Sequence, residues 1–495
     1  MRLRDLTDLL ITARLVGDGD TEFRGIEKDS RLVEPGQLFL CVPGLTVDGH
    51  AYAAEAVRKG AVAIVTERLL ALDVPQLLVK DSRLATAIIA DHVYAHPSEK
   101  IKLIGVTGTN GKTTTTYLIE KIWNDQRMQT GVIGTIEWRY DGRSFPMKGT
   151  TPDAHELQRQ LGEMRDAGMR YCAMEVSSHA LEQGRVKGCR FRTAIFTNLT
   201  QDHLDYHGTM EQYADAKGLF FSRLGNAYSQ PAQERCYAVL NADDEASVRF
   251  RMLTSAEVIT YGIEKEADVR ATAISVSARG TFFHVQTFRG EADIRLRLPG
   301  KFNVYNALAA ISAALIEGIA LDDIKTSLES IPGVPGRVES VEEGQPFSVV
   351  VDYAHTPDGL ENVLRAVQEF ADHRIICVFG CGGDRDRTKR PLMGKIAARY
   401  ADMVIVTSDN PRTENPDQIM ADIAAGLAEG EQDASRCLFI PDRRAAIQKA
   451  VEMASQGDVV LIAGKGHETY QLIGGKVYPF DDRIEAKEAI RGLLH

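Results

Sequence analysis

A glycine-rich turn between a predicted strand and a predicted helix constrains this chain more than any other feature. Residues 105–113 read Gly-Val-Thr-Gly-Thr-Asn-Gly-Lys-Thr, follow an apolar run over residues 101–106 and lead into a helical pattern over residues 114–123. Glycines let the backbone approach an anion, and the helix N-terminus adds positive potential. Lys112 would reach the outer phosphates, and the Thr113 hydroxyl would ligate magnesium. The sequence therefore predicts a protein that binds ATP or GTP.

Composition narrows the class of protein. Hydrophobic residues at 44% and charged residues at 26% are typical of a soluble globular enzyme, and no apolar run approaches the roughly 20 residues that a membrane span needs. The net charge of −11 disfavours nucleic acid as a partner, although it leaves room for a local basic pocket. Seven scattered cysteines, and an N-terminus without the apolar core of a signal peptide, indicate reduced thiols and a cytoplasmic protein.

The chain divides into three predicted α/β units, because 495 residues exceed what one hydrophobic core supports. The first unit spans residues 1–98, the second 99–332 and the third 333–495. Residues 96–98 are typical of a linker, and the Pro/Gly-rich segment 331–336 is typical of a hinge. We expect this hinge to close the third unit over the second and so exclude water.

Alternating patterns predict the architecture within these units. In the first unit, residues 53–59 have a helical pattern and residues 61–65 that of a buried strand. In the second and third units apolar strands alternate with helices, which predicts parallel sheets covered on both faces. The expected strands are residues 171–176, 193–197, 237–241, 347–351, 375–379, 403–407 and 459–462. Residues 269–298 alternate like antiparallel strands and predict a small side sheet. The predicted fold class is α/β, with a central P-loop ATPase-type sheet and a Rossmann-like third unit.

Three polar segments near the predicted phosphate loop carry candidate chemistry. Glu175 ends an apolar strand, where an acid that orders magnesium would stand, and residues 177–179 follow it. Residues 198–207 form a histidine-rich turn after the next strand, and such strand ends face the nucleotide crevice in open α/β sheets. Lys217 lies in a helical run over residues 213–221 and, taken alone, indicates a solvated surface lysine.

Three loops of the third unit each follow a predicted strand and carry charge. Because the carboxyl ends of parallel strands meet at one edge of a sheet, we expect the loops to converge on one pocket. Arg385 and Arg412 would bind carboxylates there, and Glu468 would bind an amine. The loops are residues 380–387, 408–412 and 464–468.

Five motifs of the chain together resemble the Mur ligase family. They are residues 108–113, 174–179, 198–208, 351–357 and 409–412, and the match extends from residue 29 to residue 468. The resemblance implies a UDP-MurNAc-binding first domain, an ATP-binding central domain and an amino-acid-binding third domain. It implies an ATP-dependent ligase that adds meso-diaminopimelate to UDP-MurNAc-L-Ala-D-Glu through an acyl phosphate, during peptidoglycan precursor synthesis. The Asp-Asn-Pro-Arg form of residues 409–412 is the one that goes with diaminopimelate.

The resemblance also implies roles for individual residues. Those expected to bind ATP are Gly108, Thr109, Asn110, Gly111, Lys112, Thr113, Thr114, Asn303, Arg337 and Asp352. Those expected to order magnesium are Thr113, Glu175, His203 and Lys217, and those expected to be catalytic are Lys112, Lys217, His203 and Glu175. Those expected to hold the UDP-MurNAc-dipeptide are Ser30, Leu45, Thr46, Val47, Thr150, Thr151, Ser177, Gln183 and Arg185. Those expected to hold diaminopimelate are Arg385, Asp409, Asn410, Pro411, Arg412, Gly464 and Glu468.

The family match reverses the interpretation of Lys217, because it aligns this residue with the lysine that the family carboxylates. A carbamate turns the cation into an anion that can bridge magnesium ions. The implied cofactor and partners are Mg²⁺, ATP and the two small-molecule substrates. The chain is expected to act as a monomer, without nucleic acid and without a membrane.

The sequence leaves three further functions open. A lysine-adding ligase of the same family would share every motif outside the amino-acid pocket. A folylpolyglutamate synthase has a similar core, but residues 1–98 before the phosphate loop argue against it. A nucleotide-dependent switch or motor would leave the carboxylate-binding loops unused, and the guanine-reading Asn-Lys-x-Asp motif is absent.

Overall fold

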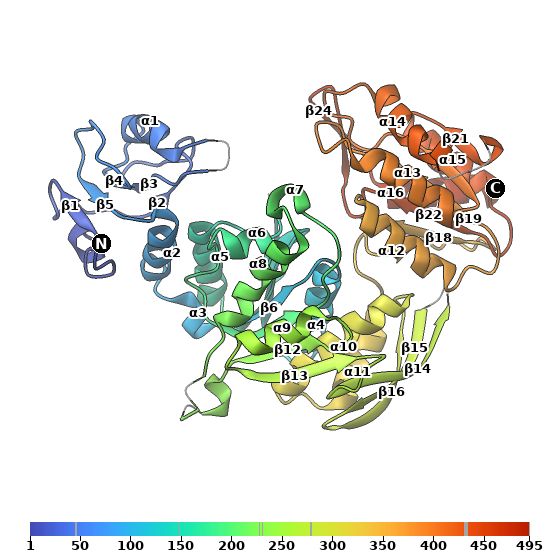
Figure 1. The fold of residues 1–495 in the computed structure, drawn as a ribbon, viewed down its shortest axis with the longest axis horizontal. Helices are drawn as coiled ribbons and strands as arrows, with labels where there is room; N and C mark the ends of the chain where they lie inside the picture. The colour runs from blue at the N-terminus through green and yellow to red at the C-terminus, as the bar shows by residue number, and fades with distance from the viewer. Residues whose placement is uncertain are drawn as a thin grey trace.

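The computed structural model in Figure 1 describes residues 1–44, 47–147, 149–226, 228–229, 231–277, 280–429 and 434–494. The described strands form sheets of five, eleven and six strands and a two-stranded hairpin. Each large sheet lies in its own lobe, and the lobes follow one another from the blue N-terminal end to the red C-terminal end (Figure 1). Within these ranges no helix has the length and apolar character that crossing a membrane requires.

The five-stranded sheet of the first lobe has the order β1-β5-β4-β3-β2, in which β1 alone runs antiparallel to its neighbour. Its elements are β1 (Arg14–Val16), β2 (Ile26–Glu27), β3 (Leu38–Leu40), α1 (Ala53–Arg58), β4 (Ala63–Thr66), β5 (Gln76–Leu78) and α2 (Ser82–Val93). The predicted helix is confirmed as α1, and the predicted strand is β4, which begins two residues later than expected.

The expected linker at residues 96–98 is wrong in part, because the short helix α3 (Pro97–Lys100) begins there. His96 adopts a left-handed backbone conformation with φ of 51°, which turns the chain after α2. Pro97 then occupies the first helical turn, where a missing N–H costs nothing and a fixed φ suits the helix. A Pro-containing segment thus starts a helix here instead of leaving the chain extended.

The eleven-stranded central sheet has the order β16-β15-β14-β13-β12-β11-β6-β10-β7-β8-β9. Its strands are β6 (Lys102–Thr107), β7 (Thr130–Ile133), β8 (Glu137–Tyr140), β9 (Arg143–Pro146), β10 (Tyr171–Glu175), β11 (Phe191–Phe196), β12 (Tyr237–Asn241), β13 (Glu257–Gly262), β14 (Val269–Ser277), β15 (Gly280–Thr287) and β16 (Gly290–Leu296). The strands from β13 to β7 are parallel, as predicted. The predicted antiparallel strands are confirmed as β14 to β16, but β14 pairs with β13, so they extend the central sheet instead of forming a separate one.

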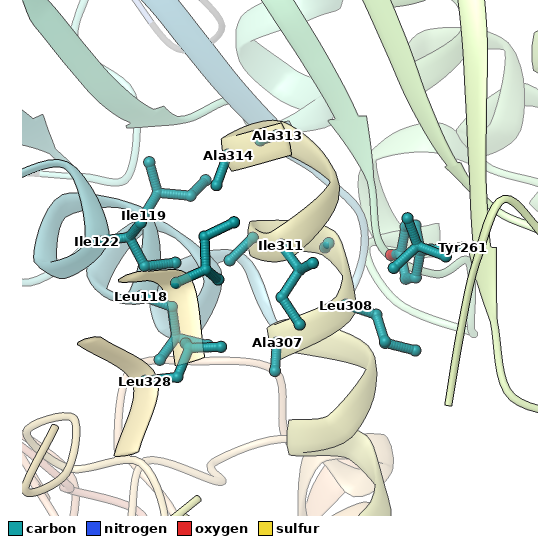
Figure 2. Close-up of a cluster of buried hydrophobic side chains, with 14 of the residues drawn as sticks. Leu118, Ile119, Ile122, Tyr261, Ala307, Leu308, Ile311, Ala313, Ala314 and Leu328 are labelled. Carbon is teal, nitrogen blue, oxygen red and sulfur yellow. The ribbon is translucent and has the colours of Figure 1, made fainter. Parts of the chain in front are cut away.

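Buried helices set the position of the phosphate loop on this sheet. Leu118, Ile119 and Ile122 of α4 (Lys112–Asp125) pack against α10 (Lys301–Ile316), as Figure 2 shows. Burying each such side chain contributes roughly 1.5–3 kcal/mol. The cluster therefore holds the N-terminal ends of α4 and α10 in a defined place at the loop. The remaining helices of the second unit are α5 (Ala154–Asp166), α6 (Ser178–Glu182), α7 (Leu204–His207), α8 (Met210–Ser222), α9 (Ala246–Leu253) and α11 (Leu321–Ser330).

The six-stranded sheet of the third lobe has the order β17-β18-β22-β19-β20-β21, parallel except at β17. Its strands are β17 (Glu339–Ser340), β18 (Ser348–Asp352), β19 (Ile375–Phe379), β20 (Met403–Val406), β21 (Cys437–Phe439) and β22 (Val459–Ala463). Its helices are α12 (Pro357–Gln368), α13 (Lys389–Tyr400), α14 (Pro416–Glu429), α15 (Arg443–Met453) and α16 (Asp482–Leu494), and β23 (Tyr470–Ile473) and β24 (Lys476–Pro479) form the hairpin. The four strands predicted for this unit are confirmed as β18, β19, β20 and β22.

All seven cysteines are free thiols, and five of them are buried. The expectation of mostly core cysteines is therefore confirmed.

Candidate active site

The loop of residues 108–111 connects β6 to α4 and requires its two glycines. Gly108 has φ of 150° and Gly111 has φ of 86°. A Cβ at Gly108 would lie 1.9 Å from Thr197 Oγ1, and a Cβ at Gly111 would lie 2.2 Å from Asn306 Oδ1. Asn198 holds the middle of the loop, because its Oδ1 accepts from Asn110 N at 3.0 Å. The loop is thus a preformed backbone cradle on a helix N-terminus, as an anion site requires.

Two lysines converge on one carbonyl of this loop. Lys112 Nζ donates to Gly108 O at 2.9 Å and to Thr109 O at 2.7 Å. Lys217 Nζ from α8 also donates to Gly108 O at 2.9 Å. Burial lowers the pKa of both amines, and the charge of Lys112 lowers the pKa of Lys217 further. Two neighbouring cations make the loop a strong anion site.

The prediction of a solvated surface lysine at Lys217 is wrong, because only 1% of this residue is exposed. Its ammonium also lies 4.4 Å from the centre of the Tyr213 ring. The helical pattern of residues 213–221 gave no sign of this burial. In the structure α8 exposes the face that carries Glu211, Asp215 and Leu219, and Lys217 lies on the covered side. The family resemblance alone pointed to Lys217.

Besides Lys217 on α8, the residues expected to order magnesium come from three places near the loop. Thr113 stands in the first turn of α4, and its Oγ1 accepts from Arg337 Nη2 at 3.2 Å. Glu175 ends β10, and its carboxylate accepts from Thr135 N and Oγ1, both at 2.9 Å. His203 precedes α7 with φ of 54°, and its ring lies 4.8 Å from that of His179.

These donors fit magnesium, although in the described part of the chain no three acidic, histidine or cysteine side chains gather into a cage. Magnesium takes oxygen ligands and is held by one or two carboxylates together with substrate phosphates and water. The Thr113 hydroxyl and the Glu175 carboxylate supply such oxygens. The phosphates of the nucleotide would therefore complete the coordination of the cation.

The third unit reaches the loop through Arg337, and Asp352 lies near that guanidinium. Arg337 reaches Thr113, lies 4.9 Å from the centre of the Tyr353 ring, and has a buried Nε without a hydrogen-bond partner among the described residues. Burial raises the pKa of Asp352, and the Arg337 charge opposes the rise. Asp352 accepts from Val338 N and Ala354 N at 2.8 Å each. An unsatisfied guanidinium donor beside the loop fits a phosphate oxygen.

Asn303 contributes indirectly. Its Nδ2 donates to Pro299 O at 2.8 Å, and its Oδ1 accepts from Asn306 Nδ2 at 3.1 Å. Asn306, which the sequence analysis did not select, is the residue that reaches the loop at Gly111. The sequence signal for Asn306 was its position about one helical turn after Asn303 on the buried helix α10.

Asp358 is a second residue that the sequence analysis missed. Its Oδ2 accepts from Asn110 Nδ2 at 2.7 Å and from Thr200 Oγ1 at 2.9 Å, so α12 of the third unit contacts the phosphate loop directly. Burial raises the pKa of this carboxyl. The only sequence signal was its position in the first helical turn after the motif of residues 351–357.

Five of the residues expected at the muramoyl-dipeptide lie together beside Glu175. Thr151 Oγ1 donates to Glu175 O at 2.8 Å, and Ser177 N donates to Thr151 Oγ1 at 3.0 Å. Arg185 Nη1 donates to Thr151 O at 2.8 Å, and its Nη2 donates to Gln183 Oε1 at 2.7 Å. Thr150 joins them through a contact of its Oγ1 with Thr135 Oγ1 at 3.1 Å.

Ser30 and Val47 belong to the first lobe. Ser30 Oγ donates to Glu55 Oε2 at 3.1 Å, and Val47 is exposed. An ion pair of Lys28 with Asp153 connects this lobe to the second unit, two residues after Thr151. Leu45 and Thr46 lie outside the described residues.

The three charged loops of the third unit converge, as predicted. Gly383 N donates to Asn410 O at 2.9 Å, and Arg412 Nη1 donates to Gly383 O at 2.7 Å. Asn410 Nδ2 donates to Glu468 Oε2 at 2.9 Å. A Cβ at Gly464 would lie 3.2 Å from Asp409 Oδ2. Arg385 is exposed and Pro411 is buried at this edge.

Arg412 is held in a left-handed backbone conformation with φ of 52°. Its N–H donates to Leu472 O at 2.9 Å, and its carbonyl accepts from Gly474 N at 2.7 Å. The hairpin β23–β24 thus fixes the turn that carries the guanidinium.

The Pro/Gly segment 331–336 is the expected pivot between the second and third units. A Cβ at Gly336 would lie 2.1 Å from His467 N, whereas a Cβ at Gly333 would meet nothing within 4 Å. Gly336 is therefore packed into the third unit, and rotation is expected before it.

We expect small-angle X-ray scattering profiles to differ between the free protein and the protein with an ATP analogue and substrate, because closure would rotate the third unit about residues 331–333. The ATP analogue alone is the matched comparison, since it lacks the second substrate. Identical profiles in every state would contradict closure.

The geometry first defines a class: a phosphate-loop protein whose nucleotide site is covered by a separate α/β unit. Three family models match the chain, described as Mur ligase family, catalytic domain (residues 22–101), Mur ligase middle domain (106–314) and Mur ligase, glutamate ligase domain (336–466). The chain is 51% identical over 491 residues to UDP-N-acetylmuramoyl-L-alanyl-D-glutamate--2,6-diaminopimelate ligase of Geobacillus thermodenitrificans, covering 99% of both chains. It belongs to the Mur ligase family.

Solved structures agree with this membership. A structure of UDP-N-acetylmuramoyl-L-alanyl-D-glutamate--2,6-diaminopimelate ligase matches with a TM-score of 0.71 and 35% identity, covering 100% of this chain and 99% of that one. A folylpolyglutamate synthase of Mycobacterium tuberculosis matches with a TM-score of 0.62 over 77% of this chain and 92% of that one, at 18% identity, which shows the fold alone.

Proposed function

We propose that this protein is an ATP-dependent ligase that joins meso-diaminopimelate to UDP-MurNAc-L-Ala-D-Glu in peptidoglycan precursor synthesis. The observation that carries the proposal is the combination of two sites: the phosphate loop with its two lysines, which Asp358 of the third unit contacts, and the third-unit pocket with Arg412 and Glu468. The printed names of the 51% and 50% identical relatives, which are diaminopimelate ligases, support it. We further propose that the protein acts as a monomer in the cytoplasm.

The chemistry starts from a carboxylate, which is a poor electrophile. Its oxygen attacks the γ-phosphorus of ATP, the bond to ADP breaks, and an acyl phosphate forms. Lys112 and the backbone N–H groups of the loop stabilise charge on the transferring group. Magnesium, held by Thr113, Glu175 and His203, would neutralise further phosphate charge.

Amide formation follows in the same enclosed site. The amine of the amino acid attacks the acyl carbon, and the tetrahedral intermediate expels inorganic phosphate. Arg337 and Asp358 of the third unit lie on the phosphate loop, so closure would exclude water that hydrolyses the acyl phosphate.

The choice of amino acid rests on Arg412. Meso-diaminopimelate is lysine with an additional carboxylate on its far carbon, and a guanidinium grips both oxygens of a carboxylate. Arg412 donates one N–H to Gly383 O at 2.7 Å, which orients the guanidinium while leaving further donors for the ligand. With lysine bound, Arg412 would face an ammonium, at a cost of at least ~1–3 kcal/mol.

Arg412→Ala is therefore expected to lose most of its activity with diaminopimelate. The ratio of its activity with diaminopimelate to its activity with lysine should fall. The measurement is ADP release with each amino acid, and Arg412→Lys is the matched control because it keeps the charge without the planar fork. If the unmutated protein prefers lysine, it is a lysine-adding ligase and the ligase proposal stands.

The products of the reaction separate a ligase from a nucleotide-dependent switch and from a folylpolyglutamate synthase. Mass spectrometry of reactions with UDP-MurNAc-dipeptide, ATP and a panel of amino acids should detect the tripeptide. ADP release without any amino acid would favour a nucleotide-dependent switch. Glutamate addition to a folate would favour a folylpolyglutamate synthase, although the five-stranded first lobe has no use in that reaction.

A further inference from the structure

The amino-acid pocket contains a buried cation for which the ligase proposal has no role. Lys465 follows β22 and is 0% exposed. Its Nζ donates to Glu468 Oε2 at 3.0 Å and to Asn410 Oδ1 at 3.2 Å, and it lies 3.7 Å from Asp409 Oδ1. A buried ammonium is tolerated only when paired in this way.

The amide oxygen of Asn410 is fully used by this network. It accepts from Lys465 Nζ at 3.2 Å and from Leu472 N at 2.9 Å. One N–H of Asn410 Nδ2 donates to Glu468 Oε2 at 2.9 Å, which leaves its second N–H for a ligand. Gln471 Nε2 adds a bond to Asp409 O at 2.7 Å, so these loops are connected to β23.

Glu468 is consequently held by one oxygen only. Lys465 and Asn410 both donate to Oε2, whereas Oε1 has no hydrogen-bond partner among the described residues. A carboxylate with one oxygen anchored and the other available can accept an ammonium in a fixed direction.

The charges of the network match a single ammonium. Asp409 and Glu468 together carry two negative charges and Lys465 carries one positive charge, which leaves one net negative charge. Behind them, Arg443 is paired with Asp482 at 2.7 Å. Without Lys465, the two carboxylates would repel each other with no cation between them.

We infer that Lys465 is a positioning residue for amino-acid selection: it anchors Glu468 Oε2 and cancels one carboxylate charge, so that Glu468 Oε1 receives the ammonium of the incoming amino acid. This inference rests on the proposed ligase function. It adds a residue that acts through Glu468 and does not itself touch the substrate.

The test compares Lys465→Met and Lys465→Gln, which remove the charge, with Lys465→Arg, which keeps it. Lys449→Met on α15 is the control, since Lys449 is a half-exposed lysine that pairs only with Glu452 on its own helix. The KM values for diaminopimelate, ATP and UDP-MurNAc-dipeptide are measured for each variant, with thermal unfolding as the check on folding.

Both neutral variants should raise the KM for diaminopimelate at least roughly 10-fold and leave the KM values for ATP and UDP-MurNAc-dipeptide within about twofold. Lys465→Arg, which keeps the charge, should leave the KM for diaminopimelate closer to that of the unmutated protein than either neutral variant does.

An equal rise in all three KM values, or an unchanged KM for diaminopimelate in both neutral variants, would overturn the inference. If one neutral variant does not fold, the second one decides. Failure of the ligase proposal is visible separately, because the unmutated protein would then release no ADP with diaminopimelate. If it uses lysine instead, the same variants are measured with lysine.

Discussion

Replacing Lys112 with alanine is expected to slow the overall reaction by more than about 10³-fold. Its ammonium already lies within the phosphate loop, where it donates to Gly108 O and Thr109 O. The transferring phosphoryl group spreads its charge over three oxygens, and a fixed cation in a site without water stabilises that charge strongly. The measurement is the rate of ADP release at saturating concentrations of all three substrates.

Lys121→Ala is the matched control for this experiment. Lys121 lies on the same helix, about one-third exposed, and pairs with Asp125 at 2.6 Å. Such a surface pair contributes little, so this variant should keep its rate. Near-normal turnover of Lys112→Ala would remove the interpretation of residues 108–113 as the phosphate loop.

Lys217→Ala is expected to be nearly inactive and to be partly rescued by short carboxylates such as acetate. Burial and the neighbouring Lys112 lower the pKa of Lys217, so that a larger share of its amine is neutral and nucleophilic. In the proposed modification, the neutral nitrogen would attack carbon dioxide, and the resulting carbamic acid would lose its proton to leave a carbamate. The two amines that donate to Gly108 O would thereby become one ammonium, on Lys112, and one carbamate, on Lys217. The carbamate would provide oxygen ligands for magnesium.

Lys112→Ala is the control for the rescue experiment. This variant lacks a cation and not an anion, so added carboxylates should not restore its activity. Nuclear magnetic resonance of the unmutated protein in ¹³C-bicarbonate should show a carbamate signal that Lys217→Ala lacks. Full activity of Lys217→Ala, or the same signal in both proteins, would refute carboxylation at this position.

Local sequence patterns predicted most of the secondary structure near the site. The strands β10, β12, β19 and β22 were predicted within one residue at each end, because an apolar run between turn residues depends mainly on close neighbours. The convergence of the three third-unit loops followed from the general rule for parallel strand ends. The extended linker expected at residues 96–98 is wrong in part, because two left-handed residues, Ala95 and His96, turn the chain before Pro97 starts a helix.

The site residues were predicted on a different basis from the secondary structure. Their predicted roles rest on a family resemblance, and no contact in the structure assigns them a ligand. Asn306 and Asp358 carried only weak local signals, and Lys465 was one unassigned charge in the selected loop 464–468, yet the structure places all three on residues of the proposed site. A lone asparagine, aspartate or lysine has the same local pattern on a surface as in a pocket.

The sequence by itself determined that the chain has a glycine-rich anion loop, alternating strands and helices, and charged loops at strand ends. Only the tertiary structure decided that Lys217 is buried against Gly108, 109 residues away, and that Asp358 contacts Asn110 across 248 residues. It also decided that β14 to β16 extend the central sheet. The physical reason is that backbone conformation follows from near neighbours, whereas burial, pKa and pairing depend on which distant segments pack against a side chain.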